Sequence, residues 1–230
     1  MRAVLRVLII ILLTFFPIFV GADPASETIL LHFDSFQEGS AILNTGNIGN
    51  RIEESNITHS SSITDSFKWN NGLFNLNQAS GSLNNQSNTA IITFTSGNSL
   101  SDIQIDYFGV STGNTIKYSG ISHRTSLIEN SFENSKGLYM VNQSPGNLNQ
   151  QSNIFFLSLG SSIMLSDDIL ATKVGNNVLE YAPGTDVERK DILRNSFSGT
   201  SGVAIVNQSS GDLNMIRSTL AISFSKEIIR

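Results

Sequence analysis

The chain has 230 residues, a formal net charge of −5 at pH 7 and no cysteine. The acidic balance disfavours nucleic acid and anionic membranes as partners, and the lack of thiols excludes disulfides. Only 14% of the residues are charged, and Asn, Ser and Gly take the places that Lys and Glu usually hold. Because these residues compete with the helix backbone, the composition favours an all-β chain.

Residues 1–22 have the pattern of a secretory signal peptide. Two arginines precede an apolar run that ends at Val20, and the small residues Gly21 and Ala22 follow it. The run is too short to cross a membrane comfortably, and no later segment is apolar for long enough to do so. We therefore expect cleavage after Ala22, a secreted protein that is extracellular or at the cell surface, and no membrane span in the mature chain.

An N-terminal leader at residues 23–48 follows, and its only strand-like piece is at residues 28–33. After the leader, a Gly-Asn step begins each of three segments, at residues 49–50, 113–114 and 175–176. The spacings of 64 and 62 residues indicate that this part of a repeating unit accepts small insertions.

A stricter repeat follows each Gly-Asn step. Similar stretches at residues 72–88, 137–153 and 202–214 are offset by 65 residues without gaps. Each has an apolar, β-prone run that ends in two amides, then a turn pair, then a second extended run. We predict an all-β, solenoid-like stack of three repeats, each with a strand-turn-strand motif. The expected units are repeat 1 at residues 49–95, a connector with repeat 2 at 96–160, and a connector with repeat 3 at 161–230.

The positions that stay constant between the copies hold amides and glycines, not acids or bases. A buried amide without partners costs about 1–3 kcal/mol, whereas amides stacked in register donate to one layer and accept from the other. The expected stacking residues are Asn77, Gln78, Asn84, Gln86, Asn88, Asn142, Gln143, Asn149, Gln151, Asn153, Asn207, Gln208 and Asn214. The turn glycines are Gly81, Gly146 and Gly211. We expect these glycines to supply positive φ angles.

Charge is absent from the first two copies of the motif. Residues 71–95 and 137–163 contain no Asp, Glu, Lys or Arg, and the connectors carry charged residues instead. A charge inside a stack would face its own copy about 4.7–4.9 Å away. The third copy departs from this pattern, because Asp212 enters its turn and Ile216-Arg217-Ser218 replace Gln-Ser-Asn. We interpret it as a degenerate, capping repeat.

No catalytic, cofactor-binding or metal site is predicted, and we do not expect an enzyme. The histidines His32, His59 and His123 do not recur with the repeat, so we expect them at surface or connector positions. The acids at residues 102 and 106 and at 167–168 lack the glycine-containing loop and closing Glu of a calcium site. A solvated edge is the simpler interpretation for these acids.

The repeat resembles a known family. Residues 130–153, where Asn-Ser-Phe and Gly precede Asn-Gln-Ser-x-Gly-x-x-Asn-x-Gln-x-Asn, are similar to the imperfect repeats of Fap-type bacterial functional amyloids, and more distantly to curli repeats. The resemblance covers residues 65–94, 130–159 and 195–224. It implies a secreted subunit, major, minor or nucleating, of extracellular biofilm fibrils. Such a subunit would associate with itself or with related fibril subunits, after export that could use an outer-membrane pore.

A second hypothesis is a monomeric, surface-exposed β-solenoid adhesin that binds a receptor or a polysaccharide through its connectors. The irregular third copy and the charged connectors favour it, because a capped end blocks polymerisation. A polysaccharide-cleaving solenoid is a weaker hypothesis, since no clustered acids or bases are available for the chemistry. Disorder, the usual property of Asn/Ser/Gly tracts, is disfavoured by the strict register and the large apolar residues within the copies.

Overall fold

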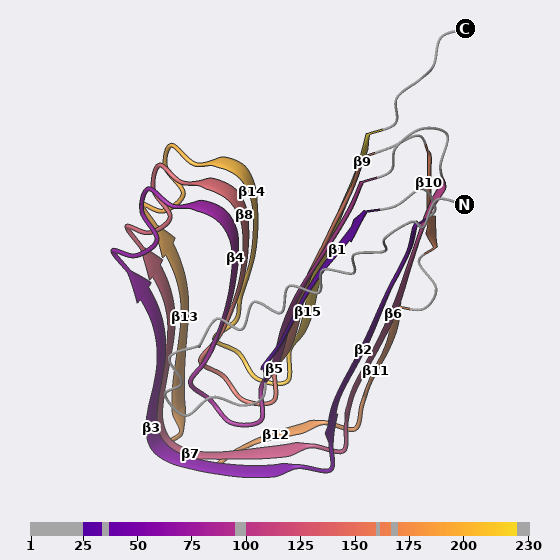
Figure 1. The fold of residues 1–230 in the computed structure, drawn as a ribbon. Helices are drawn as coiled ribbons and strands as arrows, with labels where there is room; N and C mark the ends of the chain where they lie inside the picture. The colour runs from indigo at the N-terminus through magenta and orange to yellow at the C-terminus, as the bar shows by residue number, and fades with distance from the viewer. Residues whose placement is uncertain (1–24, 34–36, 95–99, 160–161, 167–169, 225–230) are drawn as a thin grey trace, which may run out of the picture.

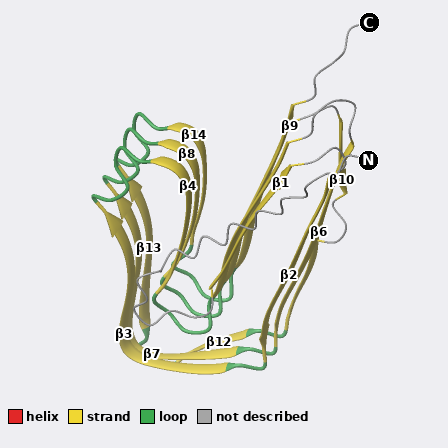
Figure 2. Ribbon diagram, viewed as in Figure 1, coloured by secondary structure: helices red, strands yellow, loops and turns green. Residues whose placement is uncertain are grey.

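The computed structural model describes residues 25–33, 37–94, 100–159, 162–166 and 170–224. Figure 2 shows strands and loops in this part of the chain, and no helix within it is long and apolar enough to cross a membrane. The strands pair in parallel as stacked layers, so the prediction of an all-β, solenoid-like fold is confirmed. The predicted signal peptide lies outside the described residues.

Each layer runs back and forth as a serpentine (Figure 1). The first layer contains β2 (Gln37–Ile48), β3 (Arg51–Thr64), β4 (Asn71–Ala79) and β5 (Asn85–Phe94). The second contains β6 (Leu100–Thr112), β7 (Thr115–Glu129), β8 (Lys136–Ser144) and β9 (Gln150–Leu159). The third contains β10 (Ser162–Ser166), β11 (Leu170–Gly175), β12 (Val178–Tyr181), β13 (Asp186–Arg194), β14 (Ser201–Gln208) and β15 (Met215–Phe224).

Each strand pairs with the strand at the same place in the next layer. In the third layer, two shorter strands replace one long strand at two places. β10 and β11 both pair with β6, and β12 and β13 both pair with β7. The motif strands keep one offset, so Asn142 pairs with Asn77 on one side and with Asn207 on the other. On β3 and β7 the register shifts at a bulge, where Ser55 pairs with Ser119 but Ile57 pairs with Ser122. Between the first two layers, the bulge absorbs the difference between 64, the spacing of the Gly-Asn steps, and 65, the spacing of the motif.

The leader contributes two strands, so the strand expected at residues 28–33 is present within β1, but the expectation that the leader has no other strand is wrong. β1 (Ala25–Phe33) pairs with β5 on the side away from β9. β2 occupies the place in the first layer that β6 occupies in the second. Both leader strands pair with motif or connector strands that are far away in sequence, and the first layer therefore begins at Gln37, ahead of the Gly-Asn step.

The sheet of β4, β8 and β14 buries both of its faces. Leu138 and Met140 of β8 pack in one cluster with Phe155 of β9. The intervening residue Tyr139 packs in another cluster with Ile128 of β7. Alternate side chains of a strand point to opposite faces, so this sheet lies between two others (Figure 1). Neither of its faces is a solvent face.

The turn between β3 and β4 repeats an uncommon backbone conformation in every layer. Phe67, Phe132 and Phe197 have φ angles of 55°, 60° and 61°. Their rings stack with centroid separations of 5.0 and 4.7 Å, and the Phe132 ring also meets the edge of Tyr139. A bulky side chain at positive φ is strained, and each aromatic pair contributes about 0.5–1.5 kcal/mol that offsets the strain.

The turns of the motif require glycine because it has no side chain. Positive φ angles in these turns belong to the leucines two positions after Gly81, Gly146 and Gly211, so the prediction of positive φ at the glycines is wrong. A Cβ on Gly81 would overlap the backbone of Gly146, and a Cβ on Gly146 would overlap that of Gly211. The turns of successive layers approach too closely to leave room for a side chain.

Candidate functional site: the amide ladders and a buried ion cluster

Two columns of asparagine face each other between the β4–β8–β14 and β5–β9–β15 sheets. Asn142 Nδ2 donates to Asn77 Oδ1 at 2.9 Å, and Asn207 Nδ2 donates to Asn142 Oδ1 at 3.0 Å. In the facing column, Asn153 Nδ2 donates to Asn88 Oδ1 at 3.0 Å. The columns are joined, because Asn142 also donates to Asn88 at 3.0 Å and Asn153 donates to Asn142 at 3.1 Å. The result is one buried amide network through the stack.

Glutamines form ladders beside these columns. Gln143 Nε2 donates to Gln78 Oε1 at 2.8 Å, and Gln208 Nε2 donates to Gln143 Oε1 at 2.9 Å. On the neighbouring strands, Gln86 Nε2 donates to Gln151 Oε1 at 2.8 Å, which is the opposite direction. Gln143 is fully buried, whereas Gln78 and Gln208 in the outer layers are partly exposed. The middle layer is thus the most enclosed part of the ladder.

The asparagines at the ends of the turns bind backbone groups instead of one another's amides. Asn84 Oδ1 accepts from the Asn149 N–H, and Asn149 Oδ1 accepts from the Asn214 N–H, both at 2.9 Å. Asn84 Nδ2 donates to the Gly146 carbonyl at 2.7 Å, and Asn149 Nδ2 donates to that of Gly211 at 2.8 Å. The side chains of Asn84 and Asn149 therefore join their turns to the next layer and satisfy backbone groups there.

The ladders through Asn77 and Gln78 have a direction. At each step, the amide nitrogen of one layer donates to the carbonyl oxygen of the layer before it. In the first layer Asn77 Nδ2 is buried without a partner. In the third layer Asn207 Oδ1 accepts from Ser218 Oγ at 2.7 Å. One end of this ladder therefore has a spare donor and the other end has a carbonyl acceptor.

The second ladder of β5 and β9 stops before the third layer. Ile216 stands in register with Gln151, and Ser218 stands in register with Asn153. An isoleucine side chain can neither donate nor accept, so Gln151 has no amide partner from β15. The third copy keeps the stacking position of its strand but loses part of the hydrogen bonding between layers.

The predicted set omits another ladder, at the turn between β2 and β3. Asn50 donates from its backbone and side-chain nitrogens to Asn114 Oδ1 at 3.0 Å, and Asn114 donates in the same way to Asn177. The Gly-Asn steps were its signal, but they align Asn114 with Asn176. In the structure Asn176 has a φ of 53° and takes the place of the glycine. Serines form a similar backbone-to-hydroxyl ladder at Ser66, Ser131 and Ser196.

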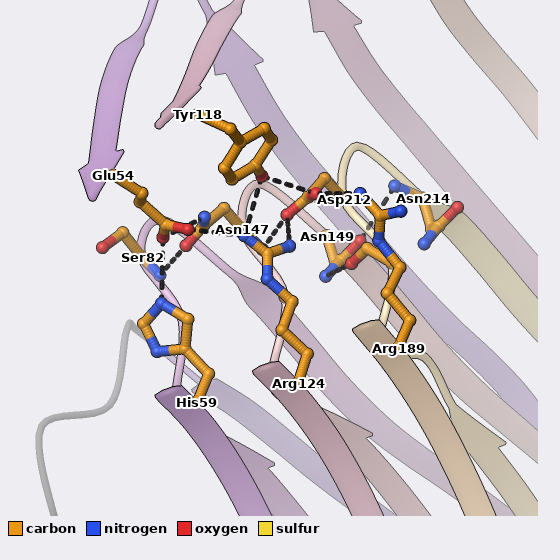
Figure 3. Close-up of polar contacts among 12 residues, drawn as sticks. Glu54, His59, Ser82, Tyr118, Arg124, Asn147, Asn149, Arg189, Asp212 and Asn214 are labelled. Atoms are coloured by element: carbon orange, nitrogen blue, oxygen red, sulfur yellow. Dashed lines mark hydrogen bonds and ion pairs between the residues drawn. The ribbon is translucent and has the colours of Figure 1, made fainter. Parts of the chain in front are cut away.

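A different kind of site lies at the bend of β3 and β7, against the turns of the motif (Figure 3). Three columns of side chains meet there, and none of them has the same residue in all three layers. The columns are Glu54, Tyr118 and Tyr181; His59, Arg124 and Arg189; and Ser82, Asn147 and Asp212. We call these residues the ion cluster. The first layer supplies an acid, the second an arginine, and the third both.

Arg124 is the centre of the ion cluster, and its side chain is fully buried. Its guanidinium binds Glu54 at 2.6 Å and forms an ion pair with Asp212. The Tyr118 hydroxyl accepts from Arg124 at 2.7 Å and donates to Asp212 at 2.6 Å. Arg189, whose side chain is 32% exposed, reaches Asp212 at 3.3 Å. Opposite charges from three layers are therefore paired away from water.

The environment of Glu54 keeps its carboxylate ionised. His59 Nε2 lies 2.9 Å from Glu54 Oε1, and Asn147 Nδ2 donates to the same oxygen. Burial acts to raise the pKa of Glu54, but the hydrogen bonds of His59 and Asn147 and the charge of Arg124 outweigh it and lower the pKa to about 2. Burial acts to lower the pKa of Arg124, but Asp212 and its other partners raise it overall. Both groups remain charged.

The ion cluster was not expected from the sequence. His59 lies outside the motif, as expected, but its side chain is only 15% exposed and contacts Glu54. The connector residue Arg124 and Asp212 of the third copy bring charge into the stack. By contrast, His123 is half exposed and binds Glu188 at 3.0 Å, whereas His32 lies where no side chains are described. Within the cluster, Arg124 and Arg189 recur at the 65-residue offset, but the acids that they bind have no acidic counterpart in the other layers.

The arrangement offers contacts between layers. Within the described part of the chain, no group of three or more His, Cys, Asp or Glu is placed to hold a metal ion. The buried acids of the ion cluster are paired with arginines and a tyrosine hydroxyl, and the ladder amides are bound to one another. The predicted solvated acids at residues 167–168 lie outside the described residues.

One comparison with known proteins identifies relatives of this fold. A family model described as the functional amyloid protein FapB/FapC family matches residues 40–225. The matched range begins within β2 and ends one residue after β15, so it includes nearly all of the three layers. No solved structure gives a significant match to the chain.

Proposed function

The chain belongs to the FapB/FapC family of functional amyloid proteins, and we propose that it is a secreted structural subunit of extracellular biofilm fibrils. In this proposal residues 1–22 are removed as a signal peptide, and export uses an outer-membrane pore. Copies then stack on each other or on related fibril subunits. The three layers of each copy form one segment of the filament, and the Asn and Gln ladders continue from copy to copy.

The observation that carries this proposal is the in-register parallel stack itself. Asn77, Asn142 and Asn207 are bound through three layers that have the same strand path, so a fourth layer could continue the pattern. Among the described residues, the outer edges of β4 and β14 have no partner strand. Unpaired edges of this kind are templates for another chain.

We further propose that this subunit is a minor or nucleating component. The third layer supports this role, because Ile216 and Ser218 replace the Gln and Asn of the ladder positions in β5 and β9. Such a chain has all its ladder amides in the first layer but lacks some of them in the third. It would start or stop a filament more readily than it would extend one. In a mixture, such a subunit would act at low molar ratio to a related major subunit.

The experiment is to follow purified mature chain, residues 23–230, by dye binding, electron microscopy and fibre diffraction. We expect fibrils that bind an amyloid dye and give reflections near about 4.7 and 10 Å, the spacings of strands and of packed sheets. A chain that stays monomeric for days at concentrations where related subunits assemble would overturn the proposal.

A matched pair of variants tests the ladder directly. Gln143→Lys puts a charge into a fully buried ladder position, whereas Ser119→Lys puts the same charge at an exposed position of the middle layer. We expect Gln143→Lys to slow fibril formation strongly and Ser119→Lys to leave it close to that of the unaltered chain. Equal rates for the two variants would show that the ladder is not needed for assembly.

A monomeric adhesin is the second candidate function. The exposed pairs of the connectors favour it, since Lys117 binds Glu180 and Lys190 binds Glu188. These charges would suit a polar receptor or a polysaccharide. A monodisperse monomer that binds cells or glycans, and loses this binding in Lys117→Ala, would select the adhesin over the fibril subunit.

A further inference from the structure

The sheets of the stack do not contain equal numbers of strands. The β4–β8–β14 sheet has three strands in three successive positions. The sheet of β3 and β7 also has three positions, because β12 and β13 together occupy the third. The β1–β5–β9–β15 sheet has four strands in four successive positions. The additional strand is β1, which occupies the outer edge of β5 at the end where β2, β3 and β4 have no outer partner among the described residues.

This inequality becomes a conflict when copies stack end to end. Adjacent strands lie about 4.8 Å apart, so three layers advance a filament by about 14 Å per copy, whereas four strands need about 19 Å. Sheets that are joined by short turns cannot follow both spacings in one filament. At each junction, β1 of one copy and β15 of its neighbour would compete for the same edge of β5.

We propose that β1 is a detachable cap on the surface that receives a second copy of this chain. The outer edge of the first layer binds the third layer of the second copy, and β1 leaves β5 so that the incoming β15 can pair there. This inference rests on the proposed function, because it concerns the same end-to-end stacking. It adds the surface, the orientation of the partner and the step that controls access.

The attachment of the two competing strands indicates that β1 is the one to leave. β1 is offset from β5 by 61 residues, since Ala25 pairs with Gln86, so it stands outside the 65-residue repeat. β15 keeps the repeat offset from β9. It is also tied to its own layer, because Ser218 Oγ donates to Asn207 and Ile222 packs against the core cluster of β8 and β9.

The two ends that would meet are complementary in their hydrogen bonding. Asn77 Nδ2 is buried without a partner in the first layer, and the equivalent nitrogens of Asn142 and Asn207 donate to the layer before them. A second copy placed with its third layer against this end presents its Asn207 oxygen at that position. The ladder then continues with unchanged direction.

The first layer of one copy and the third layer of the next are also complementary in shape. Trp69, the single tryptophan of the chain, is 73% exposed in the first layer. It corresponds to Asn134 in the second layer and to Gly199 in the third, and all three have positive φ angles. The incoming third layer therefore places a glycine against the indole, which leaves room for the ring. Burial of Trp69 gives an optical signal for the junction.

A reversible tether tests the cap. Thr28 and Thr89 are paired across β1 and β5, and paired Cα atoms about 4.8 Å apart lie within the range that a disulfide spans. The chain has no other cysteine, so Thr28→Cys with Thr89→Cys gives one defined bridge. We expect the oxidised variant to assemble at least about tenfold more slowly than the same variant after reduction, without the blue shift of Trp69 emission. Equal assembly of the two forms would overturn the inference.

A second variant tests the cap in the opposite way, because it weakens the pairing of β1 with β5. Ile29→Pro removes a backbone donor within β1, and Ile29→Val is its matched control because it keeps both the donor and the extended conformation. We expect Ile29→Pro to shorten the lag of assembly at least about threefold and Ile29→Val to leave it unchanged. An unchanged lag in Ile29→Pro would contradict the cap. If neither the unaltered chain nor any of these variants formed fibrils, the proposed function itself would fail.

Discussion

The amide ladders and the ion cluster both hold the three layers together. The ladders use the same residue in every layer, whereas the ion cluster combines different residues from different layers. Along the ladders each layer presents the same residue, as at Asn77, Asn142 and Asn207. In the ion cluster the acids Glu54 and Asp212 have no acidic counterpart in the other layers, and Arg124 in the middle layer binds both of them. An amide has both a donor and an acceptor, so it can bind a copy of itself, whereas a charge needs an opposite charge.

This difference gives the two regions different consequences for assembly. A ladder does not distinguish one layer from another, so it accepts a neighbour from the same chain or from another chain. The ion cluster distinguishes the layers, because Glu54, Arg124 and Asp212 satisfy one another only in the order first, second and third. The ladders therefore support extension, and the ion cluster fixes the internal order of each copy.

The strongest test of this comparison removes the centre of the ion cluster. Arg124→Met leaves the buried Glu54 without a guanidinium partner and leaves Asp212 with Arg189 alone. Breaking a buried ion pair in this way costs about 3–5 kcal/mol. We expect that loss in the free energy of unfolding, measured with urea on dilute monomer. Arg51→Met is the control, since Arg51 is 60% exposed and binds exposed Glu53, and we expect it to cost at most about 1 kcal/mol. Similar costs for both variants would contradict a structural role of the cluster.

The ion cluster should also respond to acid, whereas neutral amides should not. The pKa of Glu54 is lowered from its ordinary 4.5 to about 2, so its contribution is complete above pH 4.5 and is lost as the pH falls towards 2. The shift corresponds to about 3 kcal/mol. Urea midpoints between pH 6 and pH 2 should fall steeply in the unaltered chain and less so in Glu54→Gln. Glu53→Gln, an exposed neighbour, should keep the steep fall, and a steep fall in Glu54→Gln would contradict the assignment.

The ladders should be less costly to break than the cluster, because their groups are neutral. Asn142→Leu keeps a similar volume in the middle layer but removes the partner of Asn77 and Asn207, and we expect a loss of about 2–3 kcal/mol from the unpaired amides. Asn71→Leu is the control, since Asn71 is exposed at the start of β4, and we expect a change within about 0.5 kcal/mol. Urea unfolding compares the two. An Asn142→Leu cost as small as that of the control would mean that the ladder contributes little.

The comparison also explains which parts of the molecule could be predicted from its sequence. Ladder residues such as Gln78 and Gln143 recur at the repeat offset, so periodicity alone indicates where they stack. Arg124 and Arg189 recur at the repeat offset, but the acids Glu54 and Asp212 do not, and a bulge changes the offset between Glu54 and His59. Alignment of the copies therefore does not bring the acids to the arginines. β1 was equally hidden, because it pairs with β5 outside the repeat offset. Contacts between unlike residues depend on the folded register, which the sequence does not display.

At Asp212, similarity between the repeats and the charge pairing of the ion cluster favour different residues. Asp212 aligns with Asn147 and with Ser82, so Asp212→Asn makes Asn the residue of two copies out of three at this position. Changes towards a consensus usually stabilise a protein, but this one removes the acid that binds Arg124 and Tyr118. Because hydrogen bonds to charged groups contribute about 1.5–3 kcal/mol, we expect a net loss of about 2 kcal/mol in urea unfolding. A stabilised variant would mean that similarity between the layers matters more than the charge order that distinguishes them.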